Sequence, residues 1–360
     1  MHRRAFLQLS GLAASGLVLP SAVTRAFAQS PTETWRTFEV TTRVEVLAPA
    51  GRTRVWLPTP LTVDTPYQKS LGSHFKAEGS DGKAMADPTW GLGVVWAEWA
   101  PGSKPVMTLV SRFATRDVAV DLARPGKADA DRAELARYLK ATELLPTDGI
   151  VKATALEITK GAKGDVEKAR AIYDWICDNT FRDPKTRGCG TGDIKYMLET
   201  KNLSGKCADL NALYVGLARA AGLPARDVYG IRVAKSAHGY KSLGAGTENI
   251  TKAQHCRAEV FLTGHGWVPV DPADVRKVVL EEPPGNLPLG DEKVTKARAR
   301  LFGSWEMNWL AYNFAHDVAL PGAAKGTVPF FMYPQCETAE GRLDSLDPDN
   351  FKYQITAREV

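Results

Sequence analysis

The chain has 360 residues, of which 44% are hydrophobic and 24% are charged, so it can bury a substantial core and is long enough for two domains. The formal net charge of +5 includes Arg3, Arg4 and Arg25 of an N-terminal segment without acidic residues, and the rest of the chain holds 43 basic against 41 acidic side chains. This near balance gives no reason to expect nucleic acid or an anionic membrane as a partner.

Residues 1–28 are typical of a twin-arginine signal peptide. The motif HRRAFL occupies residues 2–7, a modestly apolar segment covers residues 9–23, and residues 26–28 (AFA) offer a cleavage site of the A-x-A type. The apolar segment is too short and too rich in Gly and Pro to span a membrane. A Sec signal that happens to hold two arginines is the alternative. We expect a mature chain without a membrane span, exported by the twin-arginine route and periplasmic or secreted.

Residues 29–125 are expected to form a small antiparallel β-sandwich. Apolar and polar residues alternate in segments that Gly and Pro separate, which is the pattern of short, half-buried strands. The expected strands are residues 38–46, 53–57, 94–99 and 106–113. Arg124-Pro125-Gly126 is the expected boundary to the next domain.

Residues 126–285 are expected to form a second domain, and residues 286–360 a C-terminal extension that packs on it. Apolar residues at three- and four-residue intervals predict helices, and shorter apolar runs predict strands. The expected helices are residues 130–141, 151–160, one capped by Asp165, one that begins near Cys207 and one around residues 305–314. The expected strands are residues 225–233, 256–262, 267–270, 328–333 and 351–357.

Cys207 lies in the first turn of the best-marked helix, in the segment GKCADLN. Apolar residues recur along one face of this helix until Gly222 ends it. Unpaired backbone N–H groups and the positive end of the helix dipole favour an anion at this position, and Lys206 adds a second positive charge. A thiolate is such an anion and is the reactive form of cysteine. Cys207 is therefore a candidate nucleophile.

His255 and Asp271 are the candidate partners of Cys207. A thiol nucleophile needs a base that takes its proton and returns it to the leaving group, and a carboxylate that fixes the imidazole tautomer. His255 opens the predicted strand HCRAEVFL, and Asp271 follows the next strand in the segment GWVPVDPAD. Two adjacent antiparallel strands can present both side chains to the helix end that carries Cys207.

The segments GKCADLN, HCRAEVFL and GWVPVDPAD resemble the nucleophile, histidine and aspartate motifs of the bacterial transglutaminase-like superfamily. They occur in that order, with 48 residues from Cys207 to His255 and 16 from His255 to Asp271. The resemblance spans about residues 130–285. It implies an α+β fold with a papain-like core preceded by a β domain. It also implies that Cys207 is the nucleophile, His255 the acid/base and Asp271 the residue that orients it.

Other residues compete for these roles. His238 and His265 are rivals for the base, although each lies in a predicted loop or turn, and Asp274 is the rival of Asp271. Arg257 departs from the family, because many members have Trp two residues after the histidine. This departure leaves the shape of the acyl pocket open.

The cysteine pattern leaves several arrangements open. Five cysteines are an odd number, so the four besides Cys207 could form up to two disulfides or could all stay reduced. These four are Cys177, Cys189, Cys256 and Cys336. Residues 188–193 (GCGTGD) resemble a phosphate loop only superficially and more plausibly form one wall of the cleft. Zinc-site spacings are absent, and we expect neither a metal ion nor a cofactor.

The motifs predict acyl transfer on an amide or peptide bond through a thioester on Cys207. Hydrolysis by a peptidase or amidase fits somewhat better than amine transfer by a transglutaminase, because no calcium-site motif is visible. The expected partner is a peptide or protein with an amide acyl group. The alternative is a binding or assembly module that keeps the fold and has lost turnover. Substrate identity, the second oxyanion donor and the oligomeric state stay open.

Overall fold

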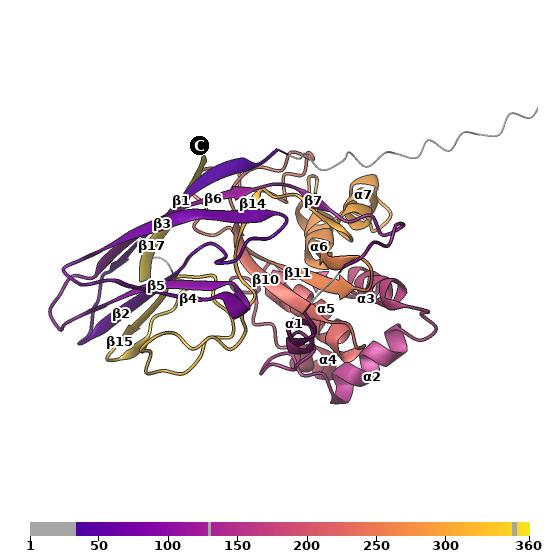
Figure 1. Ribbon diagram of the computed structural model, residues 1–360, viewed down its shortest axis with the longest axis horizontal. Helices are drawn as coiled ribbons and strands as arrows, with labels where there is room; N and C mark the ends of the chain where they lie inside the picture. The colour runs from indigo at the N-terminus through magenta and orange to yellow at the C-terminus, as the bar shows by residue number, and fades with distance from the viewer. Residues whose placement is uncertain (1–33, 129–130, 348–350) are drawn as a thin grey trace, which may run out of the picture. The chain divides into compact units, whose positions relative to one another are not determined.

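Two antiparallel sheets dominate the first region of the chain in this computed structural model, which describes residues 34–128, 131–347 and 351–360 (Figure 1). One sheet has the strand order β17-β1-β6-β3 and the other β16-β15-β2-β5-β4. Their N-terminal strands are β1 (Arg36–Val46), β2 (Thr53–Pro58), β3 (Gln68–Glu78), β4 (Lys83–Asp87), β5 (Leu92–Trp99) and β6 (Val106–Thr115). The short η1 helix (Pro88–Trp90) connects β4 to β5, and β7 (Val118–Ala119) lies outside both sheets. The predicted signal peptide, residues 1–28, lies outside the described residues.

The four predicted strands of this region are confirmed as β1, β2, β5 and β6. Their alternating buried side chains, Val40 and Val44 from β1 against Val55 and Leu57 from β2, belong to one hydrophobic core. The strands β3 and β4 were not predicted. Both lie at sheet edges, and nearly all of their residues are exposed or half-buried, so they lack the apolar alternation that marks a half-buried strand.

The C-terminal residues complete both sheets of the sandwich. Strand β17 (Phe351–Glu359) pairs antiparallel with β1, with Ala357 opposite Val40, and β15 (Gln335–Thr338) pairs with β2. The short β16 (Gly341–Arg342) pairs with β15. The C-terminal extension was predicted to pack on the second domain, and its residues 309–313 do pair with residues 229–232 there. The later strands add to the N-terminal sheets, where β1 and β2 would otherwise be open edges.

A four-stranded antiparallel sheet with the order β12-β11-β10-β14 forms the centre of the second region. Its strands are β10 (Ala225–Arg232), β11 (Gln254–Leu262), β12 (Gly266–Val270) and β14 (Trp309–Asn313). The first three confirm the predicted strands. Three two-residue strands lie nearby: β8 (Phe181–Arg182), β9 (Ser204–Gly205) and β13 (Ser304–Trp305).

The helix expected around residues 305–314 is wrong, because this segment forms β13 and β14. Trp309 and Ala311 pack into one core cluster and Leu310 and Tyr312 into another, so both faces of β14 are buried. An apolar run that is buried on both faces satisfies a helical and a strand period alike. The strand expected at residues 328–333 is also wrong, since only Val328 forms an isolated bridge, with Val318. Pro329 interrupts the segment and has no N–H to donate.

Helices pack around the central helix α5 of the second region. They are α1 (Arg132–Arg137), α2 (Gly149–Ile158), α3 (Asp165–Asn179), α4 (Ile194–Thr200), α5 (Cys207–Ala220), α6 (Pro272–Glu281) and α7 (Glu292–Arg300). Every residue of α5 is buried, and α5 packs against β10, β11, α2, α3 and α6. The residue at its N-terminus is therefore held by contacts on all sides of the helix. None of the helices in the described part of the chain has the length and apolar character needed to cross a bilayer.

Candidate active site

Cys207 is the first residue of α5, as predicted from the helix pattern. Lys206 precedes it as the N-cap in an extended conformation, and the Asp209 side chain accepts a hydrogen bond from the Lys206 N–H at 2.9 Å. This bond from the N-cap backbone to the Asp209 carboxylate fixes the first turn of the helix. The Cys207 thiol therefore lies at the positive end of a rigid, buried helix.

The loop at residues 188–193 is held against the N-terminus of α5. Asp209 Oδ1 accepts hydrogen bonds from the Thr191 and Gly192 N–H groups at 2.9 and 3.0 Å, and the Cys189 carbonyl accepts one from Ala208 N at 2.8 Å. Gly190 has a φ of +95°, and a Cβ there would lie 1.8 Å from Asp209 Oδ2. The loop lines the cleft, as predicted, and only glycine fits at its tightest point.

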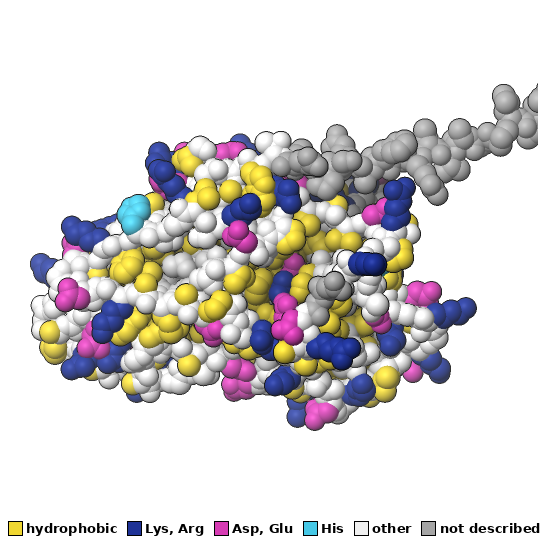
Figure 2. All heavy atoms as spheres, in the orientation of Figure 1, with side chains coloured by type: hydrophobic (Ala, Val, Ile, Leu, Met, Phe, Trp, Pro, Cys, Tyr) yellow, Lys and Arg dark blue, Asp and Glu magenta, His cyan; other side chains and the backbone are white. Residues whose placement is uncertain are grey.

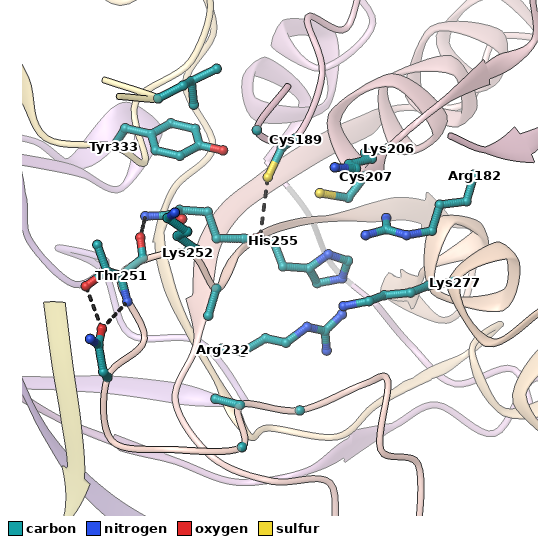
Figure 3. A pocket seen from close by; sticks show the side chains of 18 of the residues that line it. Arg182, Cys189, Lys206, Cys207, Arg232, Thr251, Lys252, His255, Lys277 and Tyr333 are labelled. Carbon is teal, nitrogen blue, oxygen red and sulfur yellow. Dashed lines mark hydrogen bonds between the residues drawn. The ribbon is translucent and has the colours of Figure 1, made fainter. Parts of the chain in front are cut away.

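His255 and Asp271 come from neighbouring segments of the central sheet. His255 lies near the start of β11, and Asp271 follows β12 and caps α6, accepting a hydrogen bond from the Asp274 N–H at 3.0 Å. His255 Nε2 lies 2.7 Å from Asp271 Oδ2 and 3.4 Å from Asp274 Oδ1. The structure thus brings both rival carboxylates to one imidazole nitrogen, with Asp271 the closer. The imidazole itself lies beside Cys207 in the cleft (Figure 3).

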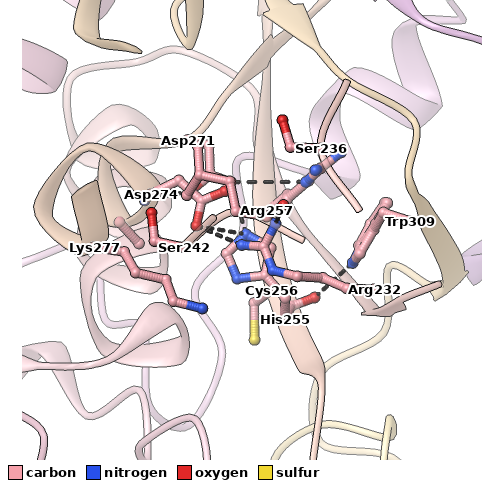
Figure 4. Close-up of polar contacts among 12 residues, drawn as sticks. Arg232, Ser236, Ser242, His255, Cys256, Arg257, Asp271, Asp274, Lys277 and Trp309 are labelled. Carbon is pink, nitrogen blue, oxygen red and sulfur yellow. Dashed lines mark hydrogen bonds and ion pairs between the residues drawn. The ribbon is translucent and has the colours of Figure 1, made fainter. Parts of the chain in front are cut away.

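Polar side chains that the sequence did not single out hold this pair in place. Asn211, one turn into α5, donates through Nδ2 to the Cys256 carbonyl at 2.8 Å and to Asp271 Oδ1 at 3.2 Å. Arg232 Nη2 donates to Asp274 Oδ1 at 2.5 Å. The Trp309 indole donates to the His255 carbonyl at 3.0 Å (Figure 4). The spacing from Cys207 to Asn211 is one helical turn, which is the only signal that could have marked Asn211.

Arg257, the departure from the family motif, is buried beside the pair. Its Nε lies 3.7 Å from Asp271 Oδ2, its Nη1 donates to the Glu306 carbonyl at 3.0 Å, and its guanidinium lies 4.7 Å from the centroid of the Trp309 ring. Burial lowers the pKa of Arg257 to about 10. Arg257 does not line the cleft, so it supports Asp271 from behind and does not reach the acyl pocket.

The charges around the site favour a thiolate and an imidazolium. Hydrogen bonding from Cys189 and Cys256 lowers the pKa of the Cys207 thiol, burial opposes this, and His255 lowers it further, so the pKa lies well below its ordinary value. Burial and Arg232 lower the pKa of His255, but Asp274 and Asp271 outweigh them and raise it to about 9. An ion pair of this kind keeps the thiol of Cys207 ionised and the imidazole of His255 protonated at neutral pH.

Three of the cysteines form one cluster. The sulfur atoms of Cys189, Cys207 and Cys256 all lie within 4.8 Å of one another, and the Cys256 thiol contacts the Met332 sulfur at 3.8 Å. Such a set of sulfur ligands suits a soft metal ion. All five cysteines are free and buried, so the arrangement in which the other four stay reduced is the one observed.

A cleft of about 530 Å³ opens onto Cys207 and His255 (Figure 3). Basic and polar residues from strands, a helix and loops line most of it, together with Cys189 and Tyr333. The rival bases lie elsewhere: His238 Nε2 lies 4.0 Å from Asp117, and His265 is in the turn between β11 and β12. Neither lines this cleft.

Comparison with known proteins places the chain among relatives. Residues 152–272 match the family model of the transglutaminase-like superfamily. An uncharacterized protein of Haemophilus influenzae is 35% identical over 343 residues, which cover 90% of this chain and 91% of that protein. This chain belongs to the transglutaminase-like superfamily. Uncharacterized protein YebA of Bacillus subtilis is 27% identical over 141 residues, 38% of this chain and 19% of that protein.

A solved structure shares the superfamily fold with this chain. The crystal structure of a Cytophaga hutchinsonii protein, named as a candidate cysteine protease, matches with a TM-score of 0.51 at 16% identity over 90% of this chain and 98% of that one. The likeness at this identity concerns the fold alone. Together with the family match, it confirms the predicted α+β fold with a papain-like transglutaminase core and an N-terminal β region.

Proposed function

We propose that the protein is a cysteine-dependent enzyme that cleaves an amide or peptide bond through a thioester on Cys207. Membership of the superfamily supports cysteine-based catalysis in general. The observation that carries the proposal is the geometry of the pair: His255 Nε2 lies 2.7 Å from Asp271 Oδ2, and the imidazole lies beside Cys207 in the cleft (Figure 3). Cys207 and His255 both line the cleft, where a substrate can reach them.

The proposed chemistry follows from the roles of the two charged groups. The Cys207 thiolate attacks the amide carbonyl carbon, and the resulting oxyanion is stabilised by the Cys207 backbone N–H at the helix N-terminus. The His255 imidazolium gives its proton to the amine nitrogen as the C–N bond breaks, which leaves a thioester. His255 then takes a proton from water, which attacks the thioester and releases the acid and the thiolate. Asp271 keeps the imidazole oriented throughout.

Hydrolysis is the favoured outcome over amine transfer. Transfer to an amine needs a site that excludes water from the thioester. The cleft here is lined by Arg182, Lys206 and other charged side chains, which favour a hydrated cleft over a dry one. We propose that the enzyme acts after export, as the N-terminal sequence predicts.

Alkylation of the thiol tests the proposal. Purified mature protein is treated with iodoacetamide between pH 4 and 9, and the modification of each cysteine is followed by peptide mass spectrometry. We expect Cys207 to react well below the ordinary thiol pKa of about 8.5, because its thiolate is stabilised, and His255→Ala to remove this reactivity at low pH. Cys336 is the internal control, since burial raises the pKa of its thiol to about 12. A Cys207 thiol that is inert at every pH would favour the silent binding module instead.

A second assay separates hydrolysis from transfer. Dimethylcasein is incubated with the protein and dansylcadaverine, and both new N-termini and incorporated dansyl groups are measured. New N-termini without dansyl incorporation are expected. Incorporation in excess of cleavage would show a transglutaminase activity and overturn the preference for hydrolysis. Cys207→Ala serves as the blank in both measurements.

A further inference from the structure

The walls of the cleft carry an excess of positive charge. Five cationic side chains line it, and its described lining residues include no Asp or Glu. The cations are Arg182, Lys206, Arg232, Lys252 and Lys277. The chain after residue 28 is close to neutral, with 43 basic against 41 acidic side chains, and the face in Figure 2 shows basic and acidic side chains interspersed. The charge of the cleft is therefore a local feature.

Part of this charge is balanced behind the walls. Arg232 is paired with Asp274, and its side chain is 3% exposed. Arg182 and Lys277 share one carboxylate, Glu281, at 2.5 and 3.7 Å. One of these two cations is therefore without a counter-charge of its own.

Lys206 and Lys252 are not balanced. Among the residues that the structure describes, no carboxylate lies within ion-pair distance of either lysine, which adds two further positive charges to the cleft. In Figure 3, Lys206 lies beside Cys207, Lys277 reaches toward the imidazole of His255, and Lys252 lies on the opposite side of His255 from Lys206. The cations therefore flank the reacting atoms on both sides.

The positive wall continues into an adjoining hollow of about 570 Å³. The two share Asn249, Thr251, Lys252 and Tyr353. The hollow adds Arg43 and Lys352, which both face one carboxylate, Glu45, at 3.8 and 3.1 Å. The positive potential thus extends from Cys207 to the β1–β17 edge of the sandwich, and cations on low-dielectric walls concentrate anions.

Building on the proposed function, we propose that the substrate is an acidic peptide, with one carboxylate next to the cleaved amide and others further along the chain. The lysines are spaced along the cleft, so they suit a ligand whose negative charges are also spaced. A peptide with several acidic residues carries its carboxylates in this way. A compact phosphate group favours a free guanidinium fork, and here Arg182 and Arg232 are already committed to carboxylates. Lys277, whose side chain is 19% exposed and which shares Glu281 with Arg182, gains a counter-charge of its own when an acidic peptide binds.

Binding of labelled peptides to the Cys207→Ala protein tests this proposal without catalysis. Fluorescein-labelled hexaglutamate and hexaglutamine are compared by anisotropy at low and high salt. We expect hexaglutamate to bind at least about tenfold more tightly and to weaken as salt screens the charges. Lys252→Met and Lys206→Met should each weaken hexaglutamate binding about three- to fivefold. Lys104→Met, in an exposed turn outside the cleft, is the matched control and should change nothing.

The outcomes separate this proposal from the proposed function. Equal binding of the two peptides, or a loss with Lys104→Met as large as with Lys252→Met, would overturn the acidic-peptide proposal and leave the thiol chemistry standing. Tripolyphosphate that binds more tightly than hexaglutamate would overturn it in favour of a phosphate ligand. Tight hexaglutamate binding to a protein whose Cys207 is never alkylated would support the acidic ligand and refute the enzyme.

Discussion

Replacing Asp274 by Asn tests how the site keeps a proton on His255. Burial and Arg232 lower the pKa of His255, while Asp274 and Asp271 raise it to about 9. Asp274 Oδ1 lies 3.4 Å from His255 Nε2. The Asp274→Asn variant keeps the shape of the side chain but removes one of the two negative charges, so the pKa of His255 should fall.

The size of the fall follows from the distance. A unit charge 3.4 Å away is worth at most about 5 kcal/mol at an effective dielectric constant of ~20, and solvent relaxation reduces this several-fold. One pKa unit corresponds to about 1.4 kcal/mol. We therefore expect the pKa of His255 to drop from about 9 to roughly 7 to 8. The imidazolium fraction at pH 8 then falls, because the lowered pKa of His255 lies at or below that pH.

Nuclear magnetic resonance can follow this titration directly. The full chain has six histidines, so the ring signals are few, and His255→Gln identifies the one that belongs to His255. Asp178→Asn is the matched control, because Asp178 pairs with Arg298 on the surface of α3, away from the cleft. It removes the same charge and should leave His255 titrating at about 9.

The stability of the variant and a double variant serve as controls. Asp274→Asn leaves Arg232 buried without its carboxylate, which can cost about 3–5 kcal/mol of stability, so unfolding is measured in parallel. Combining Asp274→Asn with Arg232→Met removes both opposing charges, and the pKa should stay nearer to that of the unaltered protein. An unchanged His255 titration in a folded Asp274→Asn variant would refute the reasoning and leave Asp271 as the sole carboxylate that holds the proton.

Three further predictions concern the surroundings of the site. Gly190→Ala should lower the free energy of unfolding, measured in urea, by about 2 kcal/mol or more, because the φ of this residue is +95° and the added Cβ would clash with Asp209. Gly102→Ala is the control, because Gly102 has a similar φ of +83° but no atom near its Cβ, so it measures the cost of the backbone conformation alone. Arg226→Met should cost about 3–5 kcal/mol, because it leaves the buried Glu259 unpaired, and adding Glu259→Gln should restore most of this loss; no restoration would contradict the ion-pair argument. Cadmium should bind the sulfur cluster and block alkylation of Cys207, and Cys189→Ser should weaken this protection at least about tenfold; equal protection in the variant would show that the cluster does not act as one site.

Much of the site was predictable because its signals are local. The apolar period of α5 and its stop at Gly222 are properties of fewer than twenty adjacent residues. The strand that carries His255 and the strand before Asp271 likewise alternate or run apolar within their own lengths. The candidate triad could therefore be named in order, with each member on the element that the structure shows.

The supporting residues were not predictable in the same way. Asp274 was only a rival of Asp271, yet both face His255 Nε2, because the first turn of α6 folds back beside β11. Arg232 looked like an ordinary strand residue, and Arg257 was noted only as a departure from the family motif. Their burial is compensated only by carboxylates and rings that the fold brings from other segments.

By itself, the sequence determined the helix at Cys207, the four half-buried strands of the first region and the order of the three motifs, because capping and periodicity act over one or two turns or a single strand. The tertiary structure alone decided that residues 309–313 form a strand between two cores, that residues 351–359 pair with β1, and that the cations of five separate segments meet in one cleft. The pairing of β17 with β1, some 300 residues apart in sequence, leaves no local pattern, and neither does the counter-ion of a buried arginine. The energy of both interactions depends on which surfaces the folded chain brings together.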